Sequence, residues 1–135
     1  MSILVFGGSG FIGSRFIRRW NQHSTTEIIN IDKLTYASDQ SNLEFINNNA
    51  KYFFYDEDIN NKNRIREIIN KHKPNIFINF AAETHVDNSI ESSYEFIKTN
   101  VLGVQTLLDL FREYYYQYQN DLNIQFIQIS TDEVY

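Results

Sequence analysis

The sequence predicts an α/β fold in which a doubly wound parallel sheet of about five strands carries helices on both faces. Short apolar runs alternate with amphipathic helical patterns along the whole chain, which is typical of strands joined by crossover helices. The 135 residues correspond to about one domain, and no internal repeat or linker interrupts them. The first strand-like run leads directly into a cluster of glycines, and the site prediction begins there.

The glycine cluster lies between a strand predicted at Ile3–Phe6 and a helix predicted at Ser14–Gln22. Gly7 allows a tight strand-to-helix turn, Gly10 lets a pyrophosphate approach the backbone, and Gly13 lets the helix pack closely. The positive end of that helix would face the phosphates. An ordinary glycine-rich turn is the alternative interpretation, because glycine spacing alone is a weak signal.

A second strand at Glu27–Ile31 is followed by Asp32, about 20 residues past the glycines, where dinucleotide folds place a ribose-binding acid. A carboxylate there accepts hydrogen bonds from the ribose hydroxyls and repels a 2′-phosphate, so NAD is favoured over NADP. The neighbouring Lys33 would soften that exclusion. The alternative interpretation of Asp32 is a turn or cap residue after the strand.

The middle of the chain predicts a short helix beginning with Ser41–Glu44, a strand at Lys51–Tyr55 and a helix at Lys62–Lys73. Between the last two, Asp58 and Ile59 lie in a loop that would meet an adenine base in a doubly wound sheet. A solvated acidic loop that caps the next helix is an equally good interpretation.

A fourth strand at Ile76–Phe80 is almost entirely apolar, as expected for a strand buried on both faces. Ala81 and Ala82 follow it, and small residues at the carboxyl end of a strand let a cofactor lie against the backbone. A possible metal or acid/base cluster follows at Glu83, His85 and Asp87. We predict no metal there, because adjacent loop positions point in different directions and further ligands are lacking.

A long helix is predicted from Ser92 or Ser93 to about Gln119. Its apolar stripe comprises Leu102, Leu107, Leu110 and Phe111. Thr99 and Asn100 lie on its early turns, where they would face the cofactor cleft. Its tyrosine-rich end, with Tyr114, Tyr115, Tyr116 and Tyr118, indicates either a subunit interface or packing against the same chain.

A fifth strand at Ile124–Ile129 leads into Thr131, Asp132 and Glu133. A hydroxyl and two carboxylates at the carboxyl end of a strand form a plausible acid/base site, in which Thr131 orients a substrate hydroxyl. Residues of these types also cap helices, and the segment by itself does not distinguish the two interpretations.

Composition excludes several classes of protein. The chain has no cysteine, so disulfides and thiolate metal sites are excluded, and its net charge of −5 argues against nucleic acid as a partner. No apolar stretch approaches the roughly 20 residues that a membrane span needs, and no signal peptide is apparent. A cytoplasmic protein without a membrane partner is therefore expected.

Together these segments resemble the extended short-chain dehydrogenase/reductase superfamily, and within it the nucleotide-sugar 4,6-dehydratases of the dTDP-glucose type. The segments that carry the resemblance are Gly7–Gly13, Asp32–Ala37, Ala81–Ile90, Thr99–Asn100 with Gly103, and Ile129–Tyr135. The Thr-Asp-Glu triplet is the specific one. The resemblance implies a Rossmann-type NAD-binding domain over residues 1–135, which stops before the family's sixth strand and substrate domain.

The resemblance also implies roles for individual residues. NAD takes a hydride from C4 of the sugar and returns it to C6, Glu133 removes the C5 proton, Asp132 protonates the departing C6 hydroxyl, and Thr131 holds the C4 hydroxyl. Thr84 would contact the substrate, which is dTDP- or UDP-glucose, and a homodimer is expected. The NAD site would comprise Gly7, Gly10, Phe11, Ile12, Gly13, Asp32, Lys33, Leu34, Thr35, Asp58, Ile59, Phe80, Ala81, Ala82 and Thr99.

The sequence departs from the family in three places and in length. Phe6 stands where threonine is usual, Thr84 where serine is common, and Asn88 where arginine is usual. The family's Tyr-x-x-x-Lys pair would lie beyond Tyr135. We therefore expect the chain by itself to bind NAD and to catalyse little; a non-catalytic NAD-binding module is the alternative.

Overall fold

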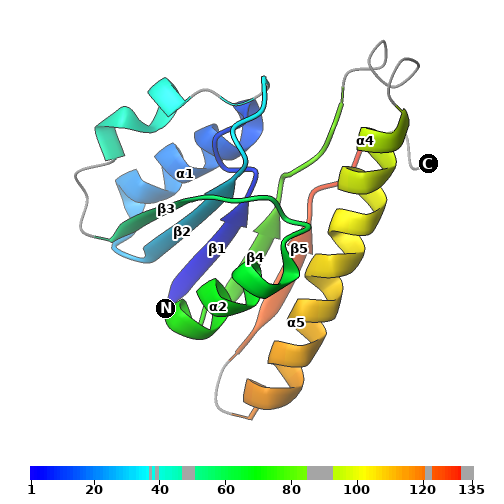
Figure 1. Cartoon of the computed structure of the whole chain (residues 1–135). Helices are drawn as coiled ribbons and strands as arrows, with labels where there is room; N and C mark the ends of the chain where they lie inside the picture. Colours follow the sequence, from blue (N-terminus) through cyan, green and yellow to red (C-terminus); the bar gives the residue numbers. More distant parts are fainter. Residues whose placement is uncertain (37, 39, 47–50, 85–92, 121–122, 132–135) are drawn as a thin grey trace.

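The computed structural model describes residues 1–36, 38, 40–46, 51–84, 93–120 and 123–131. Its elements in chain order are β1 (Ser2–Phe6), α1 (Phe11–His23), β2 (Glu27–Asp32), the 3-10 helix η1 (Gln40–Ile46), β3 (Tyr52–Asp56), α2 (Lys62–His72), β4 (Ile76–Asn79), α4 (Ser93–Ile97), the π-helical segment η2 (Lys98–Gly103), α5 (Val104–Tyr118) and β5 (Gln125–Gln128). The strands form one parallel sheet in the order β3-β2-β1-β4-β5, which confirms the predicted doubly wound fold (Figure 1).

The sheet separates two layers of helices. α1 and η1 pack on one face, and α2 and α5 pack on the other (Figure 1). Right-handed crossovers that move in opposite directions from β1 place their helices on opposite faces. The strand order reverses between β1 and β4, and ligands of open α/β sheets bind outside the carboxyl ends of the strands at such a point.

Alternate residues of β1 divide the core between the two faces. Leu4 and Phe6 contribute to the cluster under α2 and α5, whereas Ile3 and Val5 contribute to the cluster under α1 and η1. All four side chains are at most 1% exposed. Because β1 is buried on both faces, its carboxyl end and the glycine loop that follows rest on a rigid base.

Most predicted elements are confirmed, with shifted ends. α1 begins at Phe11 and not at Ser14, so Gly13 lies within its first turn. Asp32 is the last residue of β2, and β3 is displaced by one residue to Tyr52–Asp56. The end of α2 matches its prediction closely, because Lys73 adopts a left-handed conformation with φ 47° immediately before the only proline.

The predicted long helix contains a π-helical segment that its periodicity did not reveal. α4, η2 and α5 form one continuous rod, and η2 interrupts the regular pattern (Figure 1). The wider turn changes which side chains face the sheet. Leu107 and Leu110 are buried as predicted, but Leu102 is 47% exposed, so its place in the apolar stripe was wrong. Gly103 is buried instead and packs against Ile59.

The tyrosine-rich end of α5 was predicted either to form a subunit interface or to pack against the same chain, and its tyrosines differ in burial. Tyr114 is buried and Tyr118 packs beside it, with ring centroids 4.8 Å apart, so both belong to the chain's own core. Tyr116 is 70% exposed and Tyr115 is 38% exposed.

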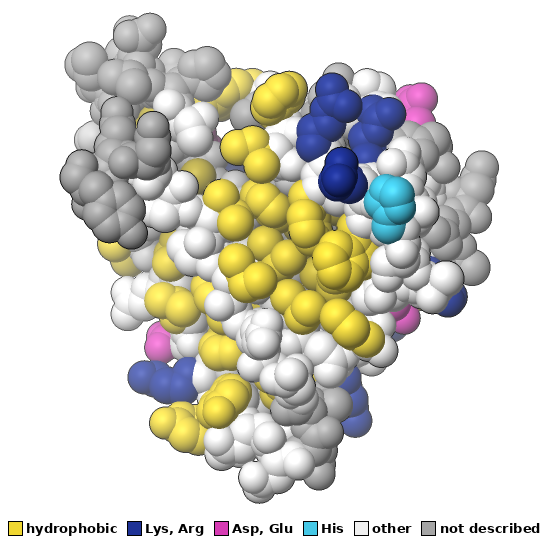
Figure 2. Space-filling model, turned by 180° about the vertical axis from the view of Figure 1, so that it is seen from behind, with side chains coloured by type: hydrophobic (Ala, Val, Ile, Leu, Met, Phe, Trp, Pro, Cys, Tyr) yellow, Lys and Arg dark blue, Asp and Glu magenta, His cyan; other side chains and the backbone are white. Residues whose placement is uncertain are grey.

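Apolar side chains gather over the middle of the rear face, beside basic side chains and a histidine (Figure 2). A groove of about 540 Å³ on this side is lined by Phe16, Arg19, Trp20, His23 and Ser24. Ile127 of the edge strand β5 is also 40% exposed. Parallel sheets are normally covered on both faces. The rear face of the sheet near β5 is therefore incompletely covered by the described residues. None of the described helices is long and apolar enough to span a bilayer.

Candidate functional site

The glycine loop after β1 is a cradle that side chains would fill. Gly7 has φ +73°, and a Cβ built there would lie 2.5 Å from the backbone nitrogen of Ala81 and 2.7 Å from its Cα. A Cβ on Gly13 would collide with the carbonyl oxygen of Gly7. Two of the three predicted glycine roles therefore have direct steric support: Gly7 permits the turn and Gly13 permits the close approach of α1.

The amino end of α1 lies at this loop without an acidic partner of its own. Gly10 precedes the helix with φ −71° and ψ 174°, no side chain caps it, and its first turn contains no acidic residue. The first N–H groups of a helix have no acceptor within the helix, and the helix dipole makes this end positive. The side chains of Phe11 and Ile12 are 78% and 61% exposed, so this end can receive an anion.

Asp32 joins the end of β2 to the glycine loop. Its Oδ2 accepts a 2.9 Å hydrogen bond from the backbone N–H of Ser9, and its Oδ1 accepts bonds from the N–H of Leu34 (2.9 Å) and the hydroxyl of Ser38 (2.7 Å). Leu34 has φ 52°, an unfavourable value for a residue with a Cβ. Asp32 therefore makes the hydrogen bonds of a turn residue, which the alternative interpretation predicted. The Ser38 hydroxyl bonds to it as a ribose hydroxyl would.

Asp58 and Ile59 follow β3 at the same edge of the sheet. Oδ1 of Asp58 accepts two 2.8 Å bonds from Asn60, one from the backbone N–H and one from the side-chain amide. Burial raises the pKa of Asp58, but these bonds and the nearby lysine charges outweigh it and hold the pKa below its ordinary value. The cap of α2 is Asn61, not Asp58. Ile59 is only 5% exposed and belongs to the core under α2 and α5.

The end of β4 is organised by a buried asparagine that the sequence pattern did not assign to the site. Asn79 is fully buried; its Oδ1 accepts a 3.0 Å bond from the N–H of Ala81, and its Nδ2 donates to Gln128 on β5 (3.0 Å). It therefore fixes the backbone that passes under Gly7. The sequence contained a feature that points to this residue, because Asn79 is the one polar residue in the apolar run Ile76–Phe80. Phe80 packs on the α1 face against Phe16, with ring centroids 5.5 Å apart.

Asn100 and Thr99 connect the long helix to this edge. Oδ1 of Asn100 accepts a 2.8 Å bond from the N–H of Glu83, and its Nδ2 donates to the Glu83 carbonyl (2.9 Å), so the side chain pairs with the backbone as a strand would. Thr99 is 3% exposed and accepts a hydrogen bond from Lys33. Both residues lie at the edge as predicted, and Asn100 serves there to position the loop.

The residues predicted to handle substrate are only partly described. Thr84 and Thr131 are exposed at the ends of the β4 and β5 segments, and Thr35 accepts a turn hydrogen bond from Ser38. Asp132 and Glu133 lie outside the described residues, as do His85 and Asp87. Among the residues that are described, no three metal-binding side chains come together.

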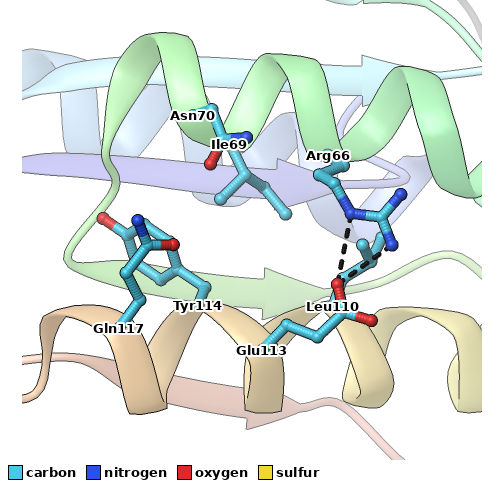
Figure 3. A pocket seen from close by; sticks show the side chains of 7 residues that line it. All are labelled: Arg66, Ile69, Asn70, Leu110, Glu113, Tyr114 and Gln117. Carbon is cyan, nitrogen blue, oxygen red and sulfur yellow. Dashed lines mark hydrogen bonds and ion pairs between the residues drawn. The ribbon is translucent and has the colours of Figure 1, made fainter.

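A small pocket between α2 and α5 lies away from this edge. It has a volume of about 70 Å³, room for about two water molecules, and its lining includes Arg66, Asn70 and Tyr114 (Figure 3). Arg66 is already paired with Glu113 at 2.9 Å (Figure 3). Its size excludes a nucleotide, so the sheet edge remains the candidate site.

Comparison with known proteins places this geometry among enzymes of nucleotide-sugar metabolism. The profile of the GDP-mannose 4,6 dehydratase family matches residues 4–135. dTDP-glucose 4,6-dehydratase of Haemophilus influenzae is 45% identical over the whole chain, and 40% of that relative is covered.

Two solved structures extend the comparison. dTDP-glucose 4,6-dehydratase of Bacillus anthracis, a complex with NAD, superposes with a TM-score of 0.84 and 38% identity, over 99% of this chain and 38% of that one. UDP-glucose 4-epimerase of Thermotoga maritima, with UDP-glucose, has a TM-score of 0.80 and 29% identity over 97% of this chain and 38% of that one. The chain thus spans about two-fifths of the length of the relatives it matches.

Proposed function

The chain belongs to the GDP-mannose 4,6 dehydratase family, and from that premise we propose that it is the NAD-binding part of a nucleotide-sugar 4,6-dehydratase. The dTDP-glucose enzyme is the favoured identity, because relatives with that name are 38–45% identical to this chain. The domain assignment, residues 1–135 as one Rossmann-type NAD-binding unit, is part of the same proposal.

The observation that carries the proposal is the fit of the sheet edge to a dinucleotide. The cradle formed by Gly7 and Gly13, beside an uncapped helix end, suits a pyrophosphate, which needs close backbone N–H groups and no Cβ. Asp32 lies next to the same loop and presents its carboxylate where ribose hydroxyls would bond. Bound NAD supplies hydride transfer to and from the sugar, and the protein supplies binding and orientation. The remaining contacts would come from the predicted NAD residues named above.

The proposed chemistry at the sugar uses the end of β5. Thr131 would accept and orient the C4 hydroxyl, Glu133 would remove the C5 proton, and Asp132 would protonate the departing C6 hydroxyl. Two neighbouring carboxylates take opposite roles if their surroundings separate their pKa values. Thr84, on the neighbouring strand's loop, would contact the same substrate.

The nucleobase of the substrate is proposed to be thymine, with uracil as the alternative. The dehydratase of Bacillus anthracis supports the first and the epimerase with UDP-glucose supports the second, at lower identity. Incubation of a full-length enzyme that contains this chain with dTDP-glucose and with UDP-glucose, followed by detection of the 4-keto product, decides between them. Product from UDP-glucose alone would contradict the favoured identity.

Binding of the cofactor is tested on the chain as it stands. We expect NADH fluorescence anisotropy to rise on addition of the protein, and Asp32→Asn to weaken the affinity at least about tenfold, the effect of losing one charge-assisted hydrogen bond. Asp56→Asn is the matched control, because Asp56 lies opposite Asp32 at the end of β3. No binding by the wild-type chain, or equal losses in both variants, would contradict the proposal.

A non-catalytic NAD-binding module is the second candidate, because the geometry of the glycine loop and of the amino end of α1 concerns cofactor binding and not chemistry at a sugar. Both candidates predict binding of NADH without turnover by this chain. They differ when the remaining region of a relative is supplied as a separate polypeptide: recovery of 4-keto product supports the dehydratase, and continued inactivity supports the module.

We also propose that the assembled protein is a cytoplasmic homodimer that uses the outer face of the long helix. Several large apolar side chains there are about half exposed or more: Tyr94, Ile97, Val101 and Leu108. Exposed apolar surface of this kind is typical of interfaces. Light scattering of the assembled protein should give twice the mass of one monomer. The variant Val101→Asp should lower the measured mass to that of one monomer.

A further inference from the structure

Lys33, immediately after the proposed ribose-binding residue Asp32, is held by groups from three other segments. Its Nζ lies 3.7 Å from Oδ2 of Asp58 and 3.9 Å from Oε1 of Glu83. It also donates a 3.4 Å hydrogen bond to Oγ1 of Thr99. These partners follow β3 and β4 and begin η2, so the ammonium group is held over the middle of the sheet edge.

The two carboxylates that hold Lys33 are themselves fixed. Asp58 accepts both bonds from Asn60 described above, and its lowered pKa keeps it ionised at neutral pH. Glu83 has a side chain that is 12% exposed, and its Oε2 accepts a 3.1 Å bond from the hydroxyl of Tyr36. The amide of Asn100 fixes its backbone. The lysine therefore faces two anions that cannot easily turn away.

We propose that Asp58 and Glu83 set the discrimination against a 2′-phosphorylated dinucleotide by holding the ammonium group of Lys33 away from Asp32. A cation beside the ribose-binding acid would neutralise a 2′-phosphate, and lysine is long enough to reach it. Because two carboxylates bind the ammonium group of Lys33, this group is not available to bind a 2′-phosphate. This inference rests on the proposed NAD site; it gives Asp58, which already belongs to that site, a role in specificity, and it adds Glu83.

The test compares affinities for NADH and NADPH by the anisotropy of the reduced nicotinamide. The main variant combines Asp58→Asn with Glu83→Gln, two nearly isosteric changes, and a triple variant adds Lys33→Met. The matched control is Asp109→Asn with Glu113→Gln, which removes two carboxylates from another lysine, Lys62, at 4.0 and 3.3 Å. It changes the net charge equally but lies away from the sheet edge. Circular dichroism verifies folding, and Glu83→Gln alone replaces the double variant if that variant does not fold.

We expect the ratio of the Kd for NADPH to the Kd for NADH to fall about tenfold in the double variant, because a freed lysine can form one charge-assisted contact with the phosphate. Adding Lys33→Met should restore the wild-type ratio, and the control should keep it within about twofold. An unchanged ratio in a double variant that still binds NADH overturns the inference. A relaxed ratio that persists in the triple variant also overturns it, because loss of carboxylate repulsion would then suffice. A wild-type chain that binds neither nucleotide overturns the proposed function together with this inference.

Discussion

Replacement of Gly7 by alanine should disrupt both the glycine loop and the fold around it. The residue has φ +73°, and the left-handed conformation costs a residue with a Cβ about 1–2 kcal/mol. The new methyl group would also lie 2.5 Å from the nitrogen of Ala81 and 2.9 Å from the carbonyl carbon of Phe80. Overpacking of this kind typically costs about 1–3 kcal/mol. The two effects together predict a loss of about 2–5 kcal/mol in the free energy of unfolding.

A loss of this size is readily measured. Domains of this class have unfolding free energies of about 5–15 kcal/mol, so Gly7→Ala should lower the urea midpoint strongly or leave the chain partly unfolded. Trp20 is the only tryptophan and packs against Phe16, so its fluorescence reports unfolding alongside circular dichroism. NADH binding should be lost as well, because the loop can no longer approach the end of β4.

Two further variants decide whether the reasoning is right. Gly103→Ala is the matched control: its Cβ would meet Cδ1 of Ile59 at 2.5 Å, but that atom ends a flexible side chain, so the cost should stay below about 2 kcal/mol. Ala81→Gly should not rescue Gly7→Ala, because the colliding atoms belong to the backbone. Rescue by Ala81→Gly, or a loss below about 1 kcal/mol in Gly7→Ala, would refute the steric account.

Three more variants test the site and the core. Asp32→Asn should lower the unfolding free energy, measured by urea titration, by about 1–3 kcal/mol. The reason is that the new side-chain NH2 group would face the backbone N–H of Ser9 or of Leu34, where no hydrogen bond can form. The lowered pKa of Asp58 means that its ionised form stabilises the fold at neutral pH and that this contribution disappears as the pH falls below about 4. Asp58→Asn should therefore flatten the decline of the urea midpoint between pH 5 and pH 3, and an unchanged decline would contradict this. Tyr114→Phe should leave stability unchanged or raise it by up to about 1 kcal/mol, because burial raises the pKa of this tyrosine to about 12 and its hydroxyl has no partner among the described residues; a large loss would reveal a hydrogen bond.

The sheet could be predicted from the sequence because each strand carries its own signal. β1 and β4 read as apolar runs, and the helices between strands have apolar faces such as Ile65, Ile68 and Ile69, all three buried. The long helix shows where this reasoning stops. Apolar periodicity assumes 3.6 residues per turn, and the wider turns of η2 shift the phase, so Leu102 faces outward and Gly103 inward.

The geometry of the candidate site could be predicted to the extent that it depends on the spacing of residues along the sequence. Gly7 and Asp32 follow from the distance between a glycine turn and the next strand end, and both lie at the predicted edge. The partners of Lys33 were not predictable, because a long side chain can reach several loops and the choice depends on tertiary packing. Asn79 could be predicted only in part. Its polarity within an apolar strand was evident from the sequence, but its hydrogen bonds to Ala81 and Gln128 became known only from the structure.

Within the described part of these 135 residues, the surface proposed for NAD is held together by more contacts than the segment proposed for acid/base chemistry. At the centre of the sheet edge, the loops are tied together by Asp32, by Lys33 and by the pairing of Asn100 with Glu83, so the surface proposed for NAD is formed by the chain's own contacts. At the β5 end the situation is different, because β5 is an edge strand and Thr131 beyond it is exposed. A preformed nucleotide surface needs no further polypeptide, whereas acid/base catalysis needs a site that excludes water. We therefore expect this chain to bind NADH by itself. Under the proposed function, we expect 4-keto product to appear only when the remaining region of a relative is supplied and encloses Thr131.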